Sequence, residues 1–456
     1  MKTMKFVQKM ASAGFGRTGV ITDIPRLPEV SIQTPALMLY TKGGSIPHIT
    51  HEVLQLISRA PHLVQLPLLS TLQMRAGVSA QGAGLATFCG LAEHPNLMVL
   101  QDPTLHTPAT KLEKYVMPLW TRMGKMEIDT DMYMDIVECY KPDMYAPLCD
   151  GCTDASSSKK RISKSMDRSS TMFHRCLERH KQSHYLSKNS SILGVIEGGH
   201  SLDQRMRCLD ILLENKDEIG GFILDGIETN GPSLEDREID SIKTIVEGVT
   251  ARLPQDKLRL FQGCWNAVAI LDLVALGWDL FDSTLPYQAT ERGCGLSFSF
   301  HIDNKHSNDG NTEEKLEEEN KMADASDQRC YEIDLSESRY AEDFRPIVEG
   351  CSCLCCSKYT RAYVNHLLLT KELLSSVLIM IHNLHHYMEF FKSIRENATT
   401  ERLAAMRAIV YRQYSQHEEA KKLKEPKTSP AIEKPRRRRL SQEGVGDNHA
   451  QVKEGA

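Results

Sequence analysis

The stretch that decides the fold runs from residue 191 to residue 286, where short apolar runs alternate with longer amphipathic runs. The short runs have the length of buried strands and read SILGVIEGG (191–199), GGFILDG (220–226), LRLFQGC (258–264) and WDLFDSTLP (278–286). The runs between them predict helices and read SLDQRMRCLDILLEN (201–215), SLEDREIDSIKTIVEGVTARL (233–253) and NAVAILDLVALG (266–277). Ser201 and Ser233 are the predicted N-caps of the first two helices.

The same alternation extends upstream. PDMYAPLCD (142–150) predicts a strand ending at Asp150, and residues 158–180 predict the helix after it. Strands that alternate with helices form a parallel sheet with right-handed crossovers, which fits a doubly wound sheet or a closed barrel. Five consecutive units favour the barrel, and no phosphate-binding GxGxxG or P-loop pattern follows these strands. We therefore predict an α/β fold, a TIM-type (β/α)8 barrel whose main part is residues 1–300.

The N-terminus and the bulk composition narrow the class of protein. Basic residues up to Arg17 precede the first acid, Asp23, which is the composition of a transit peptide, but a first strand of the fold is the favoured interpretation. Hydrophobic residues make up 41% of the chain, which argues against wholesale disorder. The net charge of −5 means that RNA binding would need a local basic patch. No uncharged apolar run is long enough to predict a transmembrane helix.

Four of the 13 cysteines lie within six residues, at 351, 353, 355 and 356. The odd total and the scattered positions of the others argue against a disulfide framework, so the cluster predicts a metal site in a reducing compartment. The Cys-x-Cys-x-x-Cys spacing of Cys351, Cys353 and Cys356 can turn three thiolates toward one Zn²⁺ ion, and Cys355 is the predicted bystander. A fourth ligand must come from downstream, where the sequence alone leaves open His366, His382, His385 and His386.

Polar segments flank this region. Residues 301–330 are a predicted acidic disordered insertion, centred on 303–328, and residues 416–456 a predicted disordered basic tail. The tail contains the run Arg436–Arg439, followed by Ser441. Residues 331–415 between them are a predicted zinc-binding subdomain with closing helices.

The segments YAEDFRP (340–346), SKYTRAY (357–363) and HNL (382–384), together with the three cysteines, resemble the zinc subdomain of the tRNA-guanine transglycosylase (queuine tRNA-ribosyltransferase) family. In that family the three cysteines and the histidine of the HNL segment bind one structural zinc. The resemblance therefore implies that Cys351, Cys353, Cys356 and His382 hold one Zn²⁺ per chain. Such a closed set leaves no position for water, so it would stabilise the fold and not catalyse.

Members of the family exchange guanine at the anticodon wobble position of certain tRNAs for queuine or a precursor. A carboxylate attacks C1′ of the ribose, and a second carboxylate acts as general base. Asp282 in LFDSTLP falls where the family keeps its nucleophile. Asp150 in DGCT resembles the Asp-Glu-Cys-Thr segment that holds guanine, and Glu197 stands where the family has the amide of Gln-Gly-Gly.

Other segments depart from the catalytic pattern. The region matched to Asp-Ser-Gly-Gly-Phe-Gln, whose Asp is the general base, is 65–74 (QLPLLSTLQM), with no carboxylate. The basic stretch after the nucleophile is replaced by 287–293 (YQATERG), and the glycine-rich base-binding loop by 225–228 (DGIE). The resemblance therefore implies a non-catalytic subunit, with no catalytic residue assigned. The alternatives are an active transglycosylase that uses Asp282 as nucleophile and, more remotely, a zinc-dependent hydrolase.

The resemblance also implies partners and location. A non-catalytic member would pair with a catalytic paralogue as a heterodimer, with a homodimer as the alternative, and would help to hold tRNA. The family resides in the cytosol, with peripheral association with the mitochondrial outer membrane as an open alternative. We expect the pairing surface on the barrel or the zinc subdomain. Arg436–Arg439 is either a source of phosphate contacts, which phosphorylation of Ser441 would weaken, or a solvated tail or sorting signal.

Overall fold

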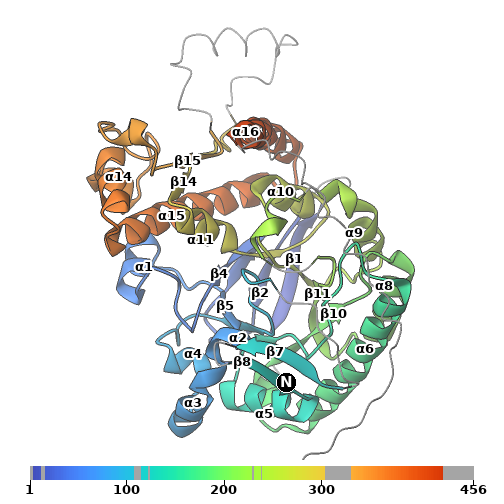
Figure 1. The fold of residues 1–456 in the computed structure, drawn as a ribbon. Helices are drawn as coiled ribbons and strands as arrows, with labels where there is room; N and C mark the ends of the chain where they lie inside the picture. Colours follow the sequence, from blue (N-terminus) through green and yellow to red (C-terminus); the bar gives the residue numbers. More distant parts are fainter. Residues whose placement is uncertain are drawn as a thin grey trace, which may run out of the picture. The chain divides into compact units, whose positions relative to one another are not determined.

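The computed structural model describes residues 4–11, 16–106, 115–121, 124–228, 231–237, 239–302 and 330–424. Eight parallel strands form a closed barrel (Figure 1): β4 (Ala36–Tyr40), β5 (Val64–Pro67), β6 (Asn96–Val99), β9 (Met144–Tyr145), β10 (Ser191–Ile196), β11 (Ile219–Leu224), β12 (Leu258–Phe261) and β13 (Leu280–Asp282). Pairing of Leu280 in β13 with Ala36 in β4 closes the ring. The predicted TIM-type barrel is therefore confirmed, and the doubly wound alternative is wrong.

Helices follow most of the strands, as the alternation predicted. They are α1 (His51–Ile57), α2 (Leu68–Thr71), α3 (Arg75–Gln81), α4 (Leu85–Phe88), α5 (Thr130–Tyr140), α6 (Lys159–Gln182), α7 (Leu186–Asn189), α8 (Leu202–Leu213), α9 (Lys243–Thr250), α10 (Ala267–Ala275) and α11 (Thr284–Glu291). Ser201 caps α8 as predicted, because its side chain accepts from the Gln204 N–H. In α6, Ile162 and Met166 belong to the buried face that the sequence indicated.

The helix predicted from Ser233 is wrong in its first half. Residues 232–241 form two short 3₁₀ turns, η2 (Pro232–Leu234) and η3 (Ile239–Ser241), and α9 begins only at Lys243. The Asn266 side chain donates to the carbonyl oxygens of Glu235 and Arg237, at 2.8 and 3.3 Å. Those carbonyls therefore have partners outside the segment, which a continuous helix would have used itself.

The predicted strand at 142–150 is also longer than the observed one. Only Met144 and Tyr145 are paired as strand residues; the Ala146 N–H still donates to the Met98 carbonyl of β6 at 3.0 Å, and the chain then leaves the sheet before Asp150. Before it, β7 (Met117–Thr121) and β8 (Gly124–Ile128) form an antiparallel hairpin that the sequence did not predict.

The N-terminal segment forms an antiparallel sheet of β1 (Lys5–Ala11), β2 (Arg17–Thr22) and β3 (Ile32–Thr34), so the first-strand interpretation is confirmed. Phe6 and Ile21 pack with Leu97, Leu193 and other residues at the starts of barrel strands in one apolar cluster. The sheet therefore covers the amino-terminal end of the barrel and leaves the carboxyl end for a site.

The C-terminal part adds β14 (Cys294–Leu296), β15 (Glu332–Asp334), η5 (Ser338–Tyr340), α13 (Leu354–Lys358), α14 (Arg361–Leu369), α15 (Leu373–Asn397) and α16 (Arg402–Lys424). The long helix α15 packs against α11 and β4, on the flank of the barrel (Figure 1). Helix α16 continues past residue 416 to Lys424. The helix therefore extends beyond the point where the disordered tail was predicted to begin. The segment 303–328, the run Arg436–Arg439 and Ser441 lie outside the described residues. Among the described residues, no helix combines the length and apolarity needed to cross a bilayer.

Candidate functional site

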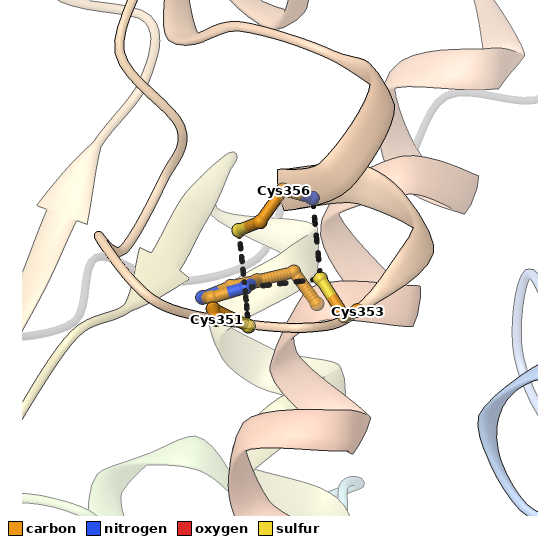
Figure 2. A group of neighbouring side chains, drawn as sticks. Cys351, Cys353 and Cys356 are labelled. Carbon is orange, nitrogen blue, oxygen red and sulfur yellow. Dashed lines mark hydrogen bonds between the residues drawn. The ribbon is translucent and has the colours of Figure 1, made fainter.

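The cysteine cluster meets α15 at one point. Cys351 follows Gly350, whose backbone is left-handed (φ +77°), and Cys353 is the N-cap of α13, where its sulfur accepts from the Cys356 N–H. The short helix carries Cys356 back over the loop. Figure 2 shows these three side chains converging, and the ring they surround is that of His382 from α15.

The geometry of this group suits a tetrahedral metal ion. Nδ1 of His382 lies 3.8 Å from the sulfur of Cys351, 3.6 Å from that of Cys353 and 3.3 Å from that of Cys356. Around Zn²⁺, with bonds of about 2.3 Å to sulfur and about 2.0 Å to nitrogen, tetrahedral angles place these atoms about 3.6 Å apart. The four ligand atoms all lie within 4.8 Å of one another, so this set could hold one ion.

A hydrogen bond at the Nε2 edge of the His382 ring, opposite the cysteines, fixes the orientation of the ring. Nε2 lies 2.8 Å from the Leu296 carbonyl oxygen in β14, so the proton belongs on Nε2 and the lone pair of Nδ1 points at the cysteines. The neighbouring Asn383 accepts from the Leu296 N–H at 2.8 Å and donates to the Cys294 carbonyl at 2.9 Å. The His-Asn pair therefore ties α15 to β14 while presenting one nitrogen to the cluster.

The other candidates lie outside the set of four converging ligand atoms, although His385 hydrogen-bonds Cys351 from the edge of the cluster. Cys355 is fully buried and points away from it, and His386 packs edge-on against Phe298. His385 contacts Ser352 at 3.4 Å, and His366 is exposed on α14. The structure thus separates His382 from His385, which sequence spacing could not.

Asp282 is the last residue of β13, at the carboxyl end of the barrel, but it is buried. Its side chain is 3% exposed, and it accepts from the Gly263 N–H at 2.6 Å and from the Thr284 N–H at 3.1 Å. The Thr284 hydroxyl donates to it as well. Burial raises the pKa of Asp282 to about 6, an effect larger than the lowering by these donors. A carboxylate so enclosed is poorly placed to attack a ribose.

A second carboxylate, Asp102, lies at the same end and corrects the sequence interpretation. The region 65–74 contains β5 and the helix after it, whereas the next strand, β6, leads into Leu100-Gln101-Asp102. The charge of Asp102 contributes to raising the pKa of Asp282, so the two carboxylates lie within electrostatic range of one another. A carboxylate at this end of the barrel therefore follows β6, outside the region 65–74 that the sequence interpretation matched. The order of the apolar runs, with Asn96–Val99 as the third, was the signal that could have found Asp102.

Asp102 is also fully engaged. The Tyr40 hydroxyl donates to its carboxylate at 2.9 Å, and Thr104 donates both its N–H (2.9 Å) and its hydroxyl (2.7 Å). Tyr40 in turn packs against Tyr287, with ring centroids 5.4 Å apart. Residues 287–293, expected to replace a basic stretch, lie mostly in α11.

Asp150, which resembles a guanine-holding residue, is paired within the chain. Its carboxylate is completely buried and receives two guanidinium contacts from Arg161, at 2.9 and 2.5 Å. Arg168 donates to it at 2.7 Å. Both arginines come from α6, so that helix neutralises the carboxylate that would otherwise bind a base.

The cavity in this end of the barrel is small. It measures about 30 Å³ and is bordered by Cys149, Gly151, Asp225 and Gln262 among others. Ligand pockets in proteins typically measure about 300–1,000 Å³, whereas a volume near 30 Å³ suits water. The site as folded therefore has no room for a purine.

The chain is similar in sequence to known proteins. Residues 12–416 match the family model described as queuine tRNA-ribosyltransferase. The chain is 36% identical over 400 residues to queuine tRNA-ribosyltransferase accessory subunit 2 of Aedes aegypti, covering 88% of this chain and 90% of that protein. It is 37% identical over 412 residues to the protein of the same name from Homo sapiens, covering 88% of this chain and 97% of that protein.

Proposed function

The chain belongs to the queuine tRNA-ribosyltransferase family, and from this membership we propose that it is the non-catalytic subunit of such an enzyme. It supports a catalytic paralogue in exchanging guanine for queuine at the tRNA wobble position. Both relatives described above carry the name accessory subunit 2, and their similarity to this chain covers 90% and 97% of their lengths.

One observation carries the proposal: the carboxyl end of the barrel is filled by the chain itself. Asp150 is bound by two arginines, Asp282 is 3% exposed, and the remaining cavity is about 30 Å³. A covalent transglycosylation needs a ribose next to its nucleophile and a base beside it. Neither fits without rearrangement of α6 and the loops at this end.

The alternative is an active transglycosylase, and a specific observation keeps it testable. Asp102 and Asp282 both lie at the carboxyl end of the barrel, within electrostatic range of one another, and could serve as a base and a nucleophile. Base exchange measured on tRNA with this chain alone, with the catalytic paralogue alone and with both separates the two functions. We expect exchange only when the paralogue is present and faster exchange when both are present. Exchange by this chain alone would overturn the proposal.

We further propose that Cys351, Cys353, Cys356 and His382 bind one structural Zn²⁺. Support comes from the nitrogen–sulfur separations of 3.3–3.8 Å and from the orientation of His382 by Leu296. Bound there, the ion supplies a cross-link between the α13 loop and α15, which stabilises the subdomain. About one equivalent of zinc in the purified chain is the expected result.

The pairing surface is proposed on the zinc subdomain. Phe344, Leu369 and Leu373 are 76%, 64% and 85% exposed and all belong to this subdomain, so they offer apolar area that a partner could bury. Their occupant is the catalytic paralogue in a heterodimer, with a homodimer as the competing outcome. Size measurement by light scattering, on the chain alone and mixed with the paralogue, distinguishes the two. Leu373→Glu should weaken pairing, whereas Leu56→Glu, at a leucine of 65% exposure on the barrel helix α1, should not.

For tRNA, the first turns of α6 offer exposed Lys159, Lys160 and Lys164 beside the carboxyl end of the barrel. Their phosphate contacts would make binding salt-dependent, and replacing all three should reduce the salt slope. We place the assembly in the cytosol. Cell fractionation decides whether it also attaches peripherally to the mitochondrial outer membrane.

A further inference from the structure

A second group of metal-ligand side chains lies at the carboxyl end of the barrel, away from the Cys351–His382 cluster. Cys149 follows β9, Glu197 follows β10 and Asp225 follows β11, and these three strands are neighbours in the barrel. One ligand atom from each residue lies within 4.8 Å of the other two. We call these three residues the Cys-Glu-Asp group.

Glu197 is the residue that most needs a partner. It is completely buried, and among the described residues no donor meets either of its carboxylate oxygens in hydrogen-bond geometry, although the Cys149 thiol lies against it. A buried carboxylate without hydrogen bonds is strongly destabilised when ionised, so such groups in proteins are paired, protonated or bound to a metal. Burial, reinforced by the charge of Asp225, raises the pKa of Glu197 well above its ordinary value.

The surrounding backbone leaves room for the two carboxylates to converge. A Cβ atom on Gly151 would lie 2.5 Å from Oδ2 of Asp225 and 3.2 Å from Oε1 of Glu197. A Cβ atom on Gly226 would collide with Oε2 of Glu197. The two glycines therefore permit a close approach that any other residue would block.

The chain supplies too little positive charge to satisfy this group. Arg205 is the buried cation beside Glu197, but its hydrogen bonds go to the carbonyl oxygens of Gly199 and Ile196, both at 2.7 Å, and its Nη2 meets no acceptor among the described residues. Arg161 and Arg168 are already engaged with Asp150. When both carboxylates are ionised, one guanidinium leaves an excess negative charge that a divalent cation would remove, and burial keeps Cys149 a neutral thiol until a metal displaces its proton.

We propose that Cys149, Glu197 and Asp225 bind a divalent metal ion of the Zn²⁺ class, at a site separate from the Cys351–His382 cluster. A thiolate with two carboxylates suits zinc better than the all-oxygen sites that magnesium and calcium prefer. Binding releases to solvent the Cys149 thiol proton and any proton held by the Glu197 or Asp225 carboxyl, whose pKa values are both raised. Cys149 and Asp225 border the cavity of about 30 Å³, which has room for a water that would complete the ligand set. The site forms whether or not the chain pairs with a catalytic subunit.

The test is a Co²⁺ titration of the full-length chain carrying its structural zinc, with zinc content measured before and after. Co²⁺ bound to the Cys149 thiolate gives a near-ultraviolet charge-transfer band without release of zinc. At a free concentration of about 100 times Kd, the thermal midpoint rises by about 3 °C. Cys149→Ser abolishes the band, and Glu197→Gln abolishes the band and the midpoint rise.

The matched control is Glu228→Gln, because Glu228 also borders the cavity but pairs with His200 and lies outside the group. This variant should respond to Co²⁺ as the wild type does. Glu197→Gln, in which a neutral amide replaces the acid, should fold even without metal, so its failure to bind is interpretable. A wild-type chain with no band and no midpoint rise would overturn the proposal and indicate that the two carboxyl groups retain their protons. Equal responses of Glu197→Gln and Glu228→Gln would overturn it too.

Discussion

Asp282→Asn offers a sharp test of whether the retained nucleophile position is structural. In the folded chain the buried Asp282 has a pKa of about 6, above the value of about 3.9 in an unfolded chain. Because the folded pKa is raised, the stabilisation is fully present below about pH 4 and is lost as the pH rises through about 6. Ionised Asp282 therefore destabilises the fold at neutral pH.

The magnitude follows from the two pKa values. They correspond to about 3 kcal/mol of lost stability by pH 8, and about half of that loss falls between pH 5 and pH 8. The residue is 3% exposed, so solvent screening does not reduce this figure much. The asparagine variant cannot ionise. Its stability relative to wild type should therefore increase by about 1 kcal/mol from pH 5 to pH 8.

The assay is urea unfolding of both chains across this pH range with zinc present, so that contributions from other groups cancel in the difference. Asp167→Asn, at an exposed carboxylate on α6, is the control and should track the wild type. Base exchange by the assembled complex should fall by far less than the powers of ten that loss of a covalent nucleophile causes. A difference that does not change with pH would refute the buried-carboxylate reasoning. Collapse of exchange in an intact complex would show that Asp282 is catalytic.

Other predictions address the metal, the interface and the subdomain packing. Cys353→Ser should lower the zinc content well below one equivalent and destabilise the chain, whereas Cys355→Ser should keep about one equivalent, as metal analysis will show. A chain lacking 303–328 and ending at Lys424 should still co-purify with the catalytic paralogue at unchanged stoichiometry; loss of the complex while zinc is retained would place the interface in the removed segments. Asn383→Ala should cost about 2–4 kcal/mol in urea unfolding, since it removes buried hydrogen bonds to β14, yet zinc content should not change.

The barrel could be predicted from sequence because its pattern is local and repeated. Each buried strand is a short apolar run, and caps such as Ser201 and Asn266 mark where helices begin. The false cap at Ser233 shows the limit of this reasoning. Asn266 and Tyr414, far away in sequence, bind the Glu235 carbonyl and favour turns over a helix there. No local pattern contains that competition.

The site was less predictable, because the role of each candidate residue depends on which barrel strand precedes it. The cysteine spacing indicated a metal centre but left His382 and His385 open, and only the family resemblance implied His382; in the structure His382 is oriented by Leu296, 86 positions away. Asp102 was missed because β5 and β6 are both short apolar runs, and matching by local motif chose the wrong one. The ion pair between Asp150 and Arg161 was not predicted either, because an arginine on a helix is usually solvent-exposed.

The two arginines that clamp Asp150 have a consequence for how a division of labour between paralogues can persist. Restoring one base-binding segment to this chain would gain nothing while Arg161 and Arg168 hold the Asp150 carboxylate and the cavity measures about 30 Å³. Removing an arginine first would leave a buried negative charge partly unpaired and would destabilise the chain. Each single substitution toward a catalytic site would therefore either leave activity unchanged or destabilise the chain. A chain in this state depends on its partner for chemistry, and selection can act only on how well it serves that partner.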